Sequence, residues 1–211
     1  MKKIMFNDKY CLTQAVLDGA KTMTRRAVTT SLLDEYDDWY EDFIYKPIGE
    51  EDYYLSTDEY VLKRTTHKVG DIVAIAQPYK DIIECLSMHS DAILDEVGMP
   101  RKEYKAGWTN KMFVKADLLP HHIRITDVKV EYLQDISDDE ILREGIYPQR
   151  FFNKVEYVFA TKGKINNTPV HRLKVFPTPR EAFAALIDKI SGKGTWENNP
   201  WVVAYEFKLI D

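Results

Sequence analysis

The sequence predicts an α+β fold: a mixed, mainly antiparallel β-sheet or barrel with short flanking helices and a large acidic insertion. Strand-like segments are separated by short helices that begin at capping residues, without the regular alternation of a parallel sheet. The chain has 211 residues, 45% of them hydrophobic, which is enough to bury a core without disulfides. It contains no internal repeat, so we expect one elaborated domain over residues 1–211, with insertions at 27–66 and 80–112.

The first expected element is a short helix over Thr13–Gly19. Thr13 can cap its N-terminus, the next turn supplies apolar side chains, and Gly19 suits a left-handed stop. The segment Lys21–Arg26 follows, and its two threonines favour an extended conformation. We therefore expect a helix, a turn and a strand at the start of the chain.

The two insertions differ in character. Residues 34–59, within the first one, contain seven aromatic residues. Because a disordered segment would lack such residues, we expect an ordered or partly ordered excursion that packs on the body by its rings. Residues 80–112 have weak periodicity, which is compatible with a short helix near Ser90–Val97 and a turn at Gly107–Trp108.

Several strands are expected in the body of the chain. Gly70 and Asp71 form a turn into Ile72–Ala76, a run that is apolar on both faces and is therefore predicted to be a central strand. Met112–Ala116 is a candidate for a short strand, and Ile123–Leu133 is a candidate for a longer one.

The C-terminal part combines capped helices with strands. A capping box at Ser137–Glu140 starts a helix that stops at Gly145, and residues 155–160 are typical of a strand. A second capping box at Thr178–Glu181, with proline at the first helical position, starts a longer helix with apolar residues at helical spacing. The final predicted strand, Trp201–Ile210, has alternating large residues.

Composition excludes several classes of protein. No apolar run approaches the length of a membrane span, so we expect no membrane partner, and the N-terminus lacks the apolar run of a signal peptide. Cys11 and Cys85 lie far apart, so a disulfide framework or a cysteine zinc site is not expected, and we predict a cytoplasmic location. Nucleotide-loop and zincin motifs are absent, and neighbouring His121 and His122 would point to opposite faces of a strand. We therefore expect neither a metal nor a cofactor.

Charge is unevenly distributed along the chain. The formal net charge is -5, which by itself would disfavour a polyanionic partner. Residues 34–59 hold eleven acids and a single base, Lys46, so that this segment carries -10. The rest of the chain holds 28 bases and 23 acids, or +5. A mildly basic body with one acidic segment is compatible with a nucleic-acid partner.

The densest polar constellation lies in Gly19–Arg26. It combines a glycine turn, one lysine, two threonine hydroxyls and two guanidinium groups. Such a cluster suits recognition of an anion or of the edge of a base. The alternative is a basic strand edge that discourages aggregation of the sheet.

The segment Val16–Arg26 resembles the opening signature of the ASCH family, the activating-signal-cointegrator homology domains, which are relatives of PUA-like RNA-binding barrels. That signature is a short helix followed by Gly-x-Lys-Thr-x-Thr-x-Arg. Three further landmarks follow in the family's order: Gly70–Ile75, the strand Ile125–Val130 with the acidic helix Ser137–Gly145, and the closing strand Val203–Phe207. The stretch Gly194–Trp201 is similar to longer members that are common in phages and prophages.

The resemblance implies a small PUA-like β-barrel with flanking helices, a ligand cleft near the opening motif and an association with RNA. Some small bacterial members are amidohydrolases that remove the acetyl group from N(4)-acetylcytidine with a lysine, a threonine and a glutamate. By motif position these correspond to Lys21, Thr24 and Glu144. The chain departs from the family at Gln77-Pro78, where many relatives have Arg-Glu, and in the insertion that follows the motif.

The three residues have distinct expected roles. Thr24 would be the nucleophile, Lys21 the base that accepts its proton, and Glu144 a supporting acid/base. Positions 21 and 24 would point to opposite faces of a regular strand, so the triad requires Lys21 to lie in the turn before the strand. Gly19 permits such a turn.

Three functions remain open from the sequence. The leading one is an RNA- or nucleotide-binding domain with its cleft at the opening motif, and the first alternative is the deacetylation of N(4)-acetylcytidine-type nucleosides. In the second alternative, the acidic segment 34–59 docks a basic protein partner. The oligomeric state is not predicted. The further residues expected to contact the ligand are Thr22, Arg25, Arg26 and Trp196.

Overall fold

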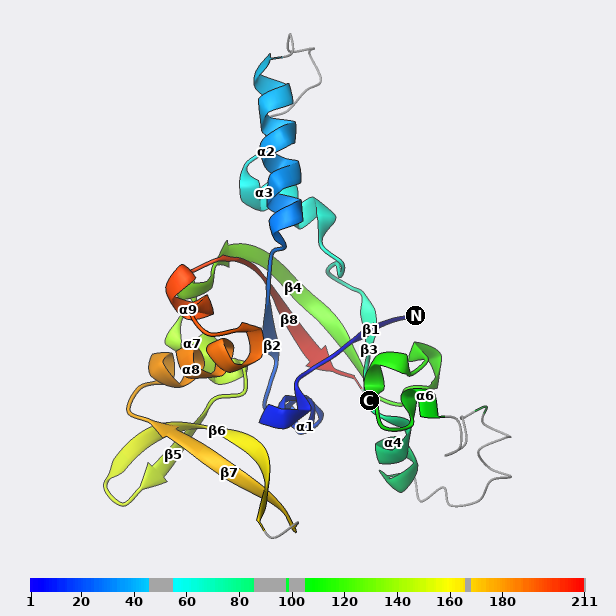
Figure 1. The fold of residues 1–211 in the computed structure, drawn as a ribbon, viewed down its shortest axis with the longest axis vertical. Helices are drawn as coiled ribbons and strands as arrows, with labels where there is room; N and C mark the ends of the chain where they lie inside the picture. Colours follow the sequence, from blue (N-terminus) through cyan, green and yellow to red (C-terminus); the bar gives the residue numbers. More distant parts are fainter. Residues whose placement is uncertain (46–54, 86–97, 99–104, 166–167, 211) are drawn as a thin grey trace.

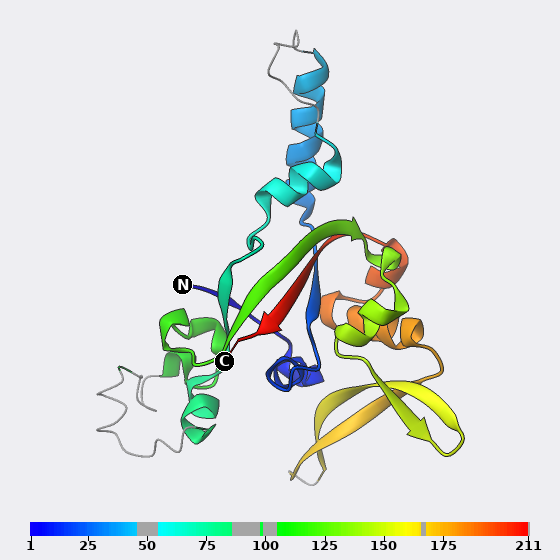
Figure 2. The ribbon, with the colours of Figure 1, turned by 180° about the vertical axis from the view of Figure 1, so that it is seen from behind.

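The computed structural model describes residues 1–45, 55–85, 98, 105–165 and 168–210. The described strands form two sheets, one of five strands and one of three, with helices beside and between them (Figure 1 and, from behind, Figure 2). The chain is therefore a mixed α+β protein, as the irregular succession of strands and capped helices predicts.

The five-stranded sheet carries most of the candidate site. Its order is β1-β3-β4-β8-β2, and only the β1–β3 pair is parallel. Since β3 lies between two partners and is buried over most of its length, the prediction of a central strand is confirmed. The bounds of the strands are β1 (Lys2–Ile4), β2 (Met23–Ala27), β3 (Ile72–Ile75), β4 (His122–Tyr132) and β8 (Trp201–Leu209).

The three-stranded sheet is antiparallel, with the order β5-β6-β7. The predicted strand at 155–160 lies within its central member, and both neighbours of that strand were missed. Pro148 contributed to this miss, because proline disfavours a strand except at an edge, and β5 is an edge. The bounds are β5 (Tyr147–Phe151), β6 (Lys154–Ile165) and β7 (Thr168–Phe176).

The predicted barrel is wrong for the described part of the chain. Strands β1 and β2 are the edges of the five-stranded sheet and do not pair with each other, so the sheet stays open. The physical reason lies at both edges. Strand β1 has only three residues, and beyond β2 the chain turns away into helix α2 (Thr30–Tyr45). A closed barrel needs edge strands that meet along a shared register.

The predicted caps of two helices are confirmed. The Ser137 hydroxyl accepts a hydrogen bond from the Glu140 backbone, and the reciprocal bond completes the capping box of α7 (Asp138–Arg143). The Thr178 hydroxyl likewise accepts from the backbone three residues later, and α8 (Pro179–Ser191) begins with its proline. Helix α9 (Thr195–Asn198) follows α8 closely.

The predicted cap of the first helix is wrong. Helix α1 spans Leu12–Leu17 and has Cys11 at its N-cap, so Thr13 lies inside it. The Thr13 hydroxyl instead donates to the Phe6 carbonyl and to the Asp8 carboxylate, at 3.3 and 2.5 Å. These acceptors come from the loop that precedes the helix, which the sequence pattern alone could not place.

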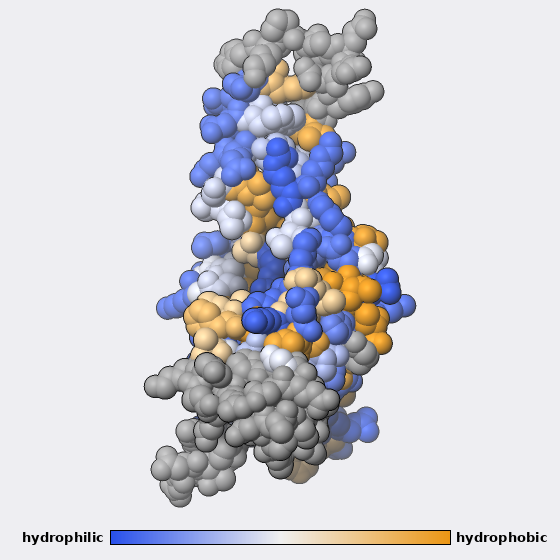
Figure 3. Space-filling view, turned by 90° about the vertical axis from the view of Figure 1, so that its right-hand side faces the viewer, coloured by the Kyte–Doolittle hydropathy of each residue, from blue (hydrophilic) through white to orange (hydrophobic). Residues whose placement is uncertain are grey.

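Helices α2 and α3 (Thr57–Arg64) form a unit that projects from the sheet (Figures 1 and 2). The rings of Tyr36, Trp39 and Tyr60 contact one another between the two helices. Attachment to the main core comes from aliphatic side chains, among them the fully buried Val61. Hydrophilic side chains cover much of the unit in Figure 3. The predicted order of this segment is thus found for its two helices, and residues 46–54 lie outside the described chain.

The region 80–112 is partly described. It holds α4 (Tyr79–Cys85) and α6 (Lys105–Trp108), which is kinked by a positive φ of 80° at Gly107, the turn that the sequence predicts. The predicted helix at Ser90–Val97 lies outside the described residues. The predicted strand at Met112–Ala116 is wrong, because the chain forms short 3-10 turns there, η2 (Lys111–Phe113) and η3 (Ala116–Leu118).

The main core lies where the large sheet meets α1, α7, α8 and β6. Ile123, Ile136 and Phe159 are among its fully buried members. A smaller core joins β3 to α4 and the 3-10 turns around Tyr79. No helix in the described part of the chain combines the length and apolar character needed to cross a membrane.

Candidate functional site

The turn after α1 gives Lys21 its unusual position. Gly19 has a φ of 71°, and the backbone N–H groups of Ala20 and Lys21 both donate to the Ala15 carbonyl, at 2.9 and 2.8 Å. This closes the helix in a left-handed turn. Lys21 therefore precedes β2, as the triad requires, and it is freed from the alternation of the strand.

Lys21 is buried against Glu144. The lysine is 2% exposed and the glutamate 4%. The Lys21 ammonium donates to the Glu144 carboxylate at 2.6 Å and to the Glu144 carbonyl at 2.8 Å. Glu144 caps the C-terminus of α7, and the next residue is Gly145 with a φ of 97°. A Cβ on Gly145 would lie 2.9 Å from the Leu12 side chain and 3.7 Å from that of Lys21, so glycine allows this close approach.

Arg25 connects Glu144 to two further carboxylates. Its guanidinium donates to Glu144 at 3.0 Å, to Glu131 at 2.6 and 2.9 Å and to Glu140 at 3.0 Å. Lys129 completes the group, with contacts of 2.8 Å to Glu131 and 2.6 Å to Glu140. We call these six residues the charge network: Lys21, Arg25, Lys129, Glu131, Glu140 and Glu144.

A small residue on β8 makes room for this network. Arg25 on β2 and Lys129 on β4 are both in register with Ala204, which lies between them. Residues directly opposite in adjacent strands point to the same face of a sheet. Because Ala204 ends at its methyl group, the Arg25 side chain can cross β8 and reach Glu131 on β4. Arg25 is thus a positioning residue for Glu144.

The electrostatics of the network follow from burial and pairing. Burial lowers the pKa of Lys21, while the charge and hydrogen bond of Glu144 act in the opposite direction without cancelling the shift. Burial raises the pKa of Glu140, but hydrogen bonds from Lys129 and the Ser137 backbone, together with nearby cations, outweigh it and lower the pKa to about 2. The network holds three bases and three acids, so its pairs are balanced in charge.

Lys21, Thr24 and Glu144 line a single cavity of about 300 Å³, which we call the inner cavity. Thr24 belongs to the edge strand β2 and is 6% exposed. Apolar side chains from α8, among them Phe183 and Leu186, form another wall. No described residue of α2 or α3 lines this cavity, so the described part of the acidic insertion does not cover it.

The other predicted ligand contacts are distributed differently. Arg25 and Arg26 both line the inner cavity, and exposed Arg26 donates to the Met5 carbonyl at 2.5 Å. Thr22 lies outside the cavity, where its hydroxyl accepts from Arg143 at 3.0 Å. Trp196 is not among the residues that line the cavity, and its ring packs edge-on against Phe183 with centroids 6.0 Å apart.

Sequence reasoning missed the apolar wall of the cavity. Phe183, Leu186 and Ile187 were recognised only as the core-facing stripe of a helix. A helix that packs across the edge of a sheet uses the same stripe to cover the core and to line a cavity, so the periodicity carries no signal for the second role.

The described residues contain no cluster of three or more His, Cys, Asp or Glu side chains arranged to hold a metal ion. Comparisons of the chain with protein-family models, with curated proteins and with solved structures found no match. The resemblance to ASCH domains therefore rests on the sequence motifs quoted above.

Proposed function

We propose that this chain is an RNA- or nucleotide-binding domain of the ASCH, PUA-like type, and that the inner cavity is its ligand cleft. One observation carries the proposal. Lys21, Thr24 and Glu144, which come from a turn, a strand and the end of a helix, line the same cavity. Charged side chains buried to this degree are rare outside functional or structural networks, and here they border a space rather than a packed core.

The lining suits a nucleobase. An ammonium group has three N–H donors, and two of those on Lys21 are used by Glu144. Within the described chain the third has no protein acceptor, so it can bind a carbonyl oxygen of a ligand. Phe183 and Leu186 offer an apolar wall to the face of a base, and Thr24 can donate or accept at its edge. Apolar walls with a few convergent polar groups are typical of small-molecule sites.

The test is calorimetric titration with N(4)-acetylcytidine and with a short single-stranded RNA that contains it. Thr24→Val should weaken binding about fivefold, the effect of losing one hydrogen bond. Thr22→Val is the matched control, because it removes a hydroxyl two residues away and outside the cavity. Equal effects of the two variants, or no binding of either ligand, would contradict the proposal.

A second candidate, deacetylation of N(4)-acetylcytidine-type nucleosides, is favoured by the lowered pKa of buried Lys21, which lines the same cavity as Thr24. A neutral Lys21 would accept the Thr24 proton while the hydroxyl oxygen attacks the acetyl carbonyl. The carbon–nitrogen bond then breaks, and the amine of cytidine leaves with a proton returned through Lys21 or Glu144. Water cleaves the acetyl-threonine ester, which releases acetate and restores Thr24.

Chromatographic analysis of N(4)-acetylcytidine incubated with pure protein separates this candidate from simple binding. Turnover that is lost in Thr24→Val and in Lys21→Met, while both variants keep a cooperative unfolding transition, would support the hydrolase. Binding of the nucleoside without release of acetate would contradict the hydrolase and support binding as the only function of the cavity.

A further inference from the structure

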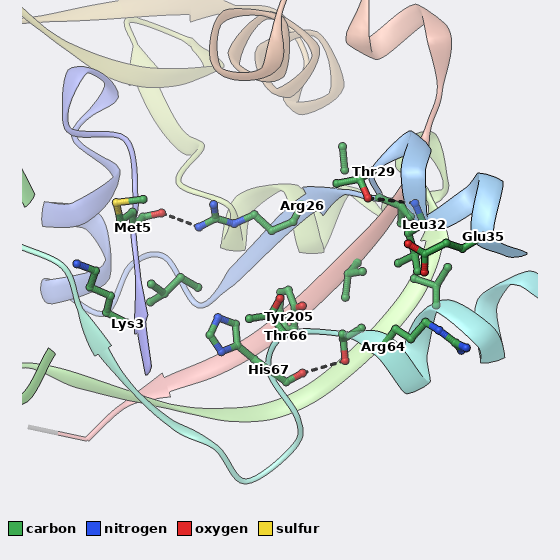
Figure 4. Close-up of a pocket in the computed structure, with 16 residues that line it drawn as sticks. Lys3, Met5, Arg26, Thr29, Leu32, Glu35, Arg64, Thr66, His67 and Tyr205 are labelled. Carbon is green, nitrogen blue, oxygen red and sulfur yellow. Dashed lines mark hydrogen bonds between the residues drawn. The ribbon is translucent and has the colours of Figure 1, made fainter. Parts of the chain in front are cut away.

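A second and larger cavity lies next to the inner cavity. It has a volume of about 760 Å³, and we call it the outer groove. Met5, Arg26 and Ala27 line both spaces, so the two are neighbours that share a wall. Figure 4 shows the outer groove between β2, β8 and the bases of α2 and α3, with the Arg26 side chain pointing toward Met5.

Cations outnumber carboxylates among the charged residues that line the outer groove. Lys3, Arg26 and Arg64 are its permanent cations, and Glu35 is the only carboxylate among its described lining residues. The Arg64 guanidinium lies 3.5 Å from the centroid of the Tyr60 ring. That contact orients the side chain without neutralising its charge. The groove therefore keeps an excess of cations, in contrast to the balanced charge network beside the inner cavity.

His67 is a buried histidine in the wall of the outer groove. The residue is 7% exposed and lines the outer groove, yet its Nδ1 atom has no hydrogen-bond partner within the described chain. Its ring packs edge-on against Tyr205, with centroids 5.6 Å apart. Burial, followed by the charge of Lys2, lowers the pKa of His67, which favours the neutral form of the ring. Because the unpartnered Nδ1 atom is itself buried, it is not open to a ligand in the groove, and His67 forms part of the groove wall.

Resting on the proposed function, we infer that the outer groove holds the phosphate-bearing neighbour of the nucleoside in the inner cavity, so that the ligand is a single-stranded polynucleotide rather than a free nucleoside. Arg26 borders both spaces, which is where the linking phosphate of such a ligand would lie. Arg64 also lines the groove and can contact the next phosphate or base.

The groove has room for this ligand. Its volume of about 760 Å³ lies within the range of roughly 300–1,000 Å³ typical of ligand pockets. A free nucleoside would fill only the smaller inner cavity of about 300 Å³. An uncharged nucleoside would also leave the cations of the groove without a counter-charge.

The experiment compares two probes on the same protein. These are free N(4)-acetylcytidine and a five-nucleotide single-stranded RNA with N(4)-acetylcytidine at its centre, titrated at low and high salt. We expect the RNA to bind at least tenfold more tightly at low salt, with the difference shrinking as salt rises. Equal affinity of the two probes, or an advantage of RNA that salt does not change, would overturn the inference and leave the proposed function intact.

Substitutions on α3 test whether the tighter binding of RNA comes from the outer groove. Arg64→Gln should weaken RNA binding about tenfold, as expected for a lost charge-assisted hydrogen bond, and should leave nucleoside binding unchanged. It should also reduce the slope of log affinity against log salt by about 0.7, the contribution of one single-strand phosphate contact. Lys63→Gln is the matched control, because it removes the same charge from the adjacent position, and Lys63 does not line the groove.

Further outcomes separate the two proposals. Arg64→Lys should recover most of the affinity if charge is what matters, and a thermal melt will show whether each variant is folded. If Arg64→Gln weakened the binding of RNA and of the free nucleoside equally, the proposed role of the groove in binding RNA would be wrong. RNA binding that Arg64→Gln weakens and Thr24→Val does not change would support the groove as an RNA contact, but it would overturn both the nucleoside cavity and the proposed link between the two spaces.

Discussion

The inner cavity and the outer groove use charged side chains in opposite ways. Around the inner cavity, Lys21 and Arg25 are buried and each is paired with carboxylates at hydrogen-bonding distance. In the outer groove, Arg26 and Arg64 are not paired with carboxylates in any described contact, and they bond backbone carbonyls or stack on a ring. Buried charges need partners to be tolerated and therefore fix geometry, whereas accessible cations remain available to a mobile anion.

The largest expected effect comes from breaking the interior pairing. Glu144→Ala leaves buried Lys21 without its carboxylate and should lower the free energy of unfolding by about 3–5 kcal/mol, the usual penalty for removing one member of a buried pair. Urea denaturation measures this change. The control is Glu206→Gln, which breaks a 2.6 Å contact with Arg143 between residues about one third exposed and should change stability by less than about 1 kcal/mol. If Glu144→Ala and Glu206→Gln changed the free energy of unfolding equally, the buried pair would be no more important for stability than the exposed one.

The second effect is a pH dependence specific to the network. Because the pKa of Glu140 is lowered from 4.5 to about 2, its contribution to stability is fully present above pH 4.5 and is lost as the pH falls toward 2. At pH 3 the wild type should have lost about 2 kcal/mol relative to neutral pH from this group. Glu140→Gln should flatten this part of the acid limb in urea denaturation. An acid limb that is unchanged by the substitution would show that Glu140 is not held in this way.

A smaller effect tests how tightly the wall of the inner cavity is packed. Gly145→Ala places a Cβ 2.9 Å from the Leu12 side chain at a φ of 97°, and it should destabilise the protein by on the order of 1–2 kcal/mol. Gly19→Ala is the control, because its φ is also positive but its Cβ meets nothing within 4 Å. If the two variants melt at the same temperature, crowding against Leu12 does not contribute to the loss of stability.

The smallest effect belongs to the outer groove. Arg64→Gln should change the free energy of unfolding by less than about 1 kcal/mol, because its guanidinium forms one exposed cation–π contact and one long hydrogen bond of 3.4 Å. The same substitution is expected to weaken RNA binding tenfold. A large loss of stability would show that Arg64 supports the fold in the same way as the charge network. The contrast between the inner cavity and the outer groove would then be wrong.

Local signals in the sequence were reliable where they depend on neighbouring residues. The Ser137 and Thr178 caps, the central strand β3, and the turn that places Lys21 before β2 all follow from short-range rules, and the structure has them. The Thr13 cap failed because its hydroxyl found acceptors in the preceding loop.

Long-range pairings could not be predicted. Arg25 was expected to contact a ligand, but it reaches glutamates 106, 115 and 119 residues away in sequence. Nothing near Arg25 in the chain indicates them. His67 and Arg64 carry no motif, and they become relevant only because α3 is folded beside β2 and β8. The sequence predicted that Lys21 and Glu144 lie close together only through its resemblance to the ASCH family, and no local pattern indicated it.

The crossing of Arg25 over Ala204 has an evolutionary consequence. The network links strands β2 and β4, which have no backbone pairing with each other, and its three bases are balanced by three acids. A single substitution among them leaves an unpaired charge, so drift at one position should be accompanied by change at another. Among homologues we expect the six residues and the small residue at position 204 to vary together, as an inherited unit, while the cations of the outer groove vary one at a time.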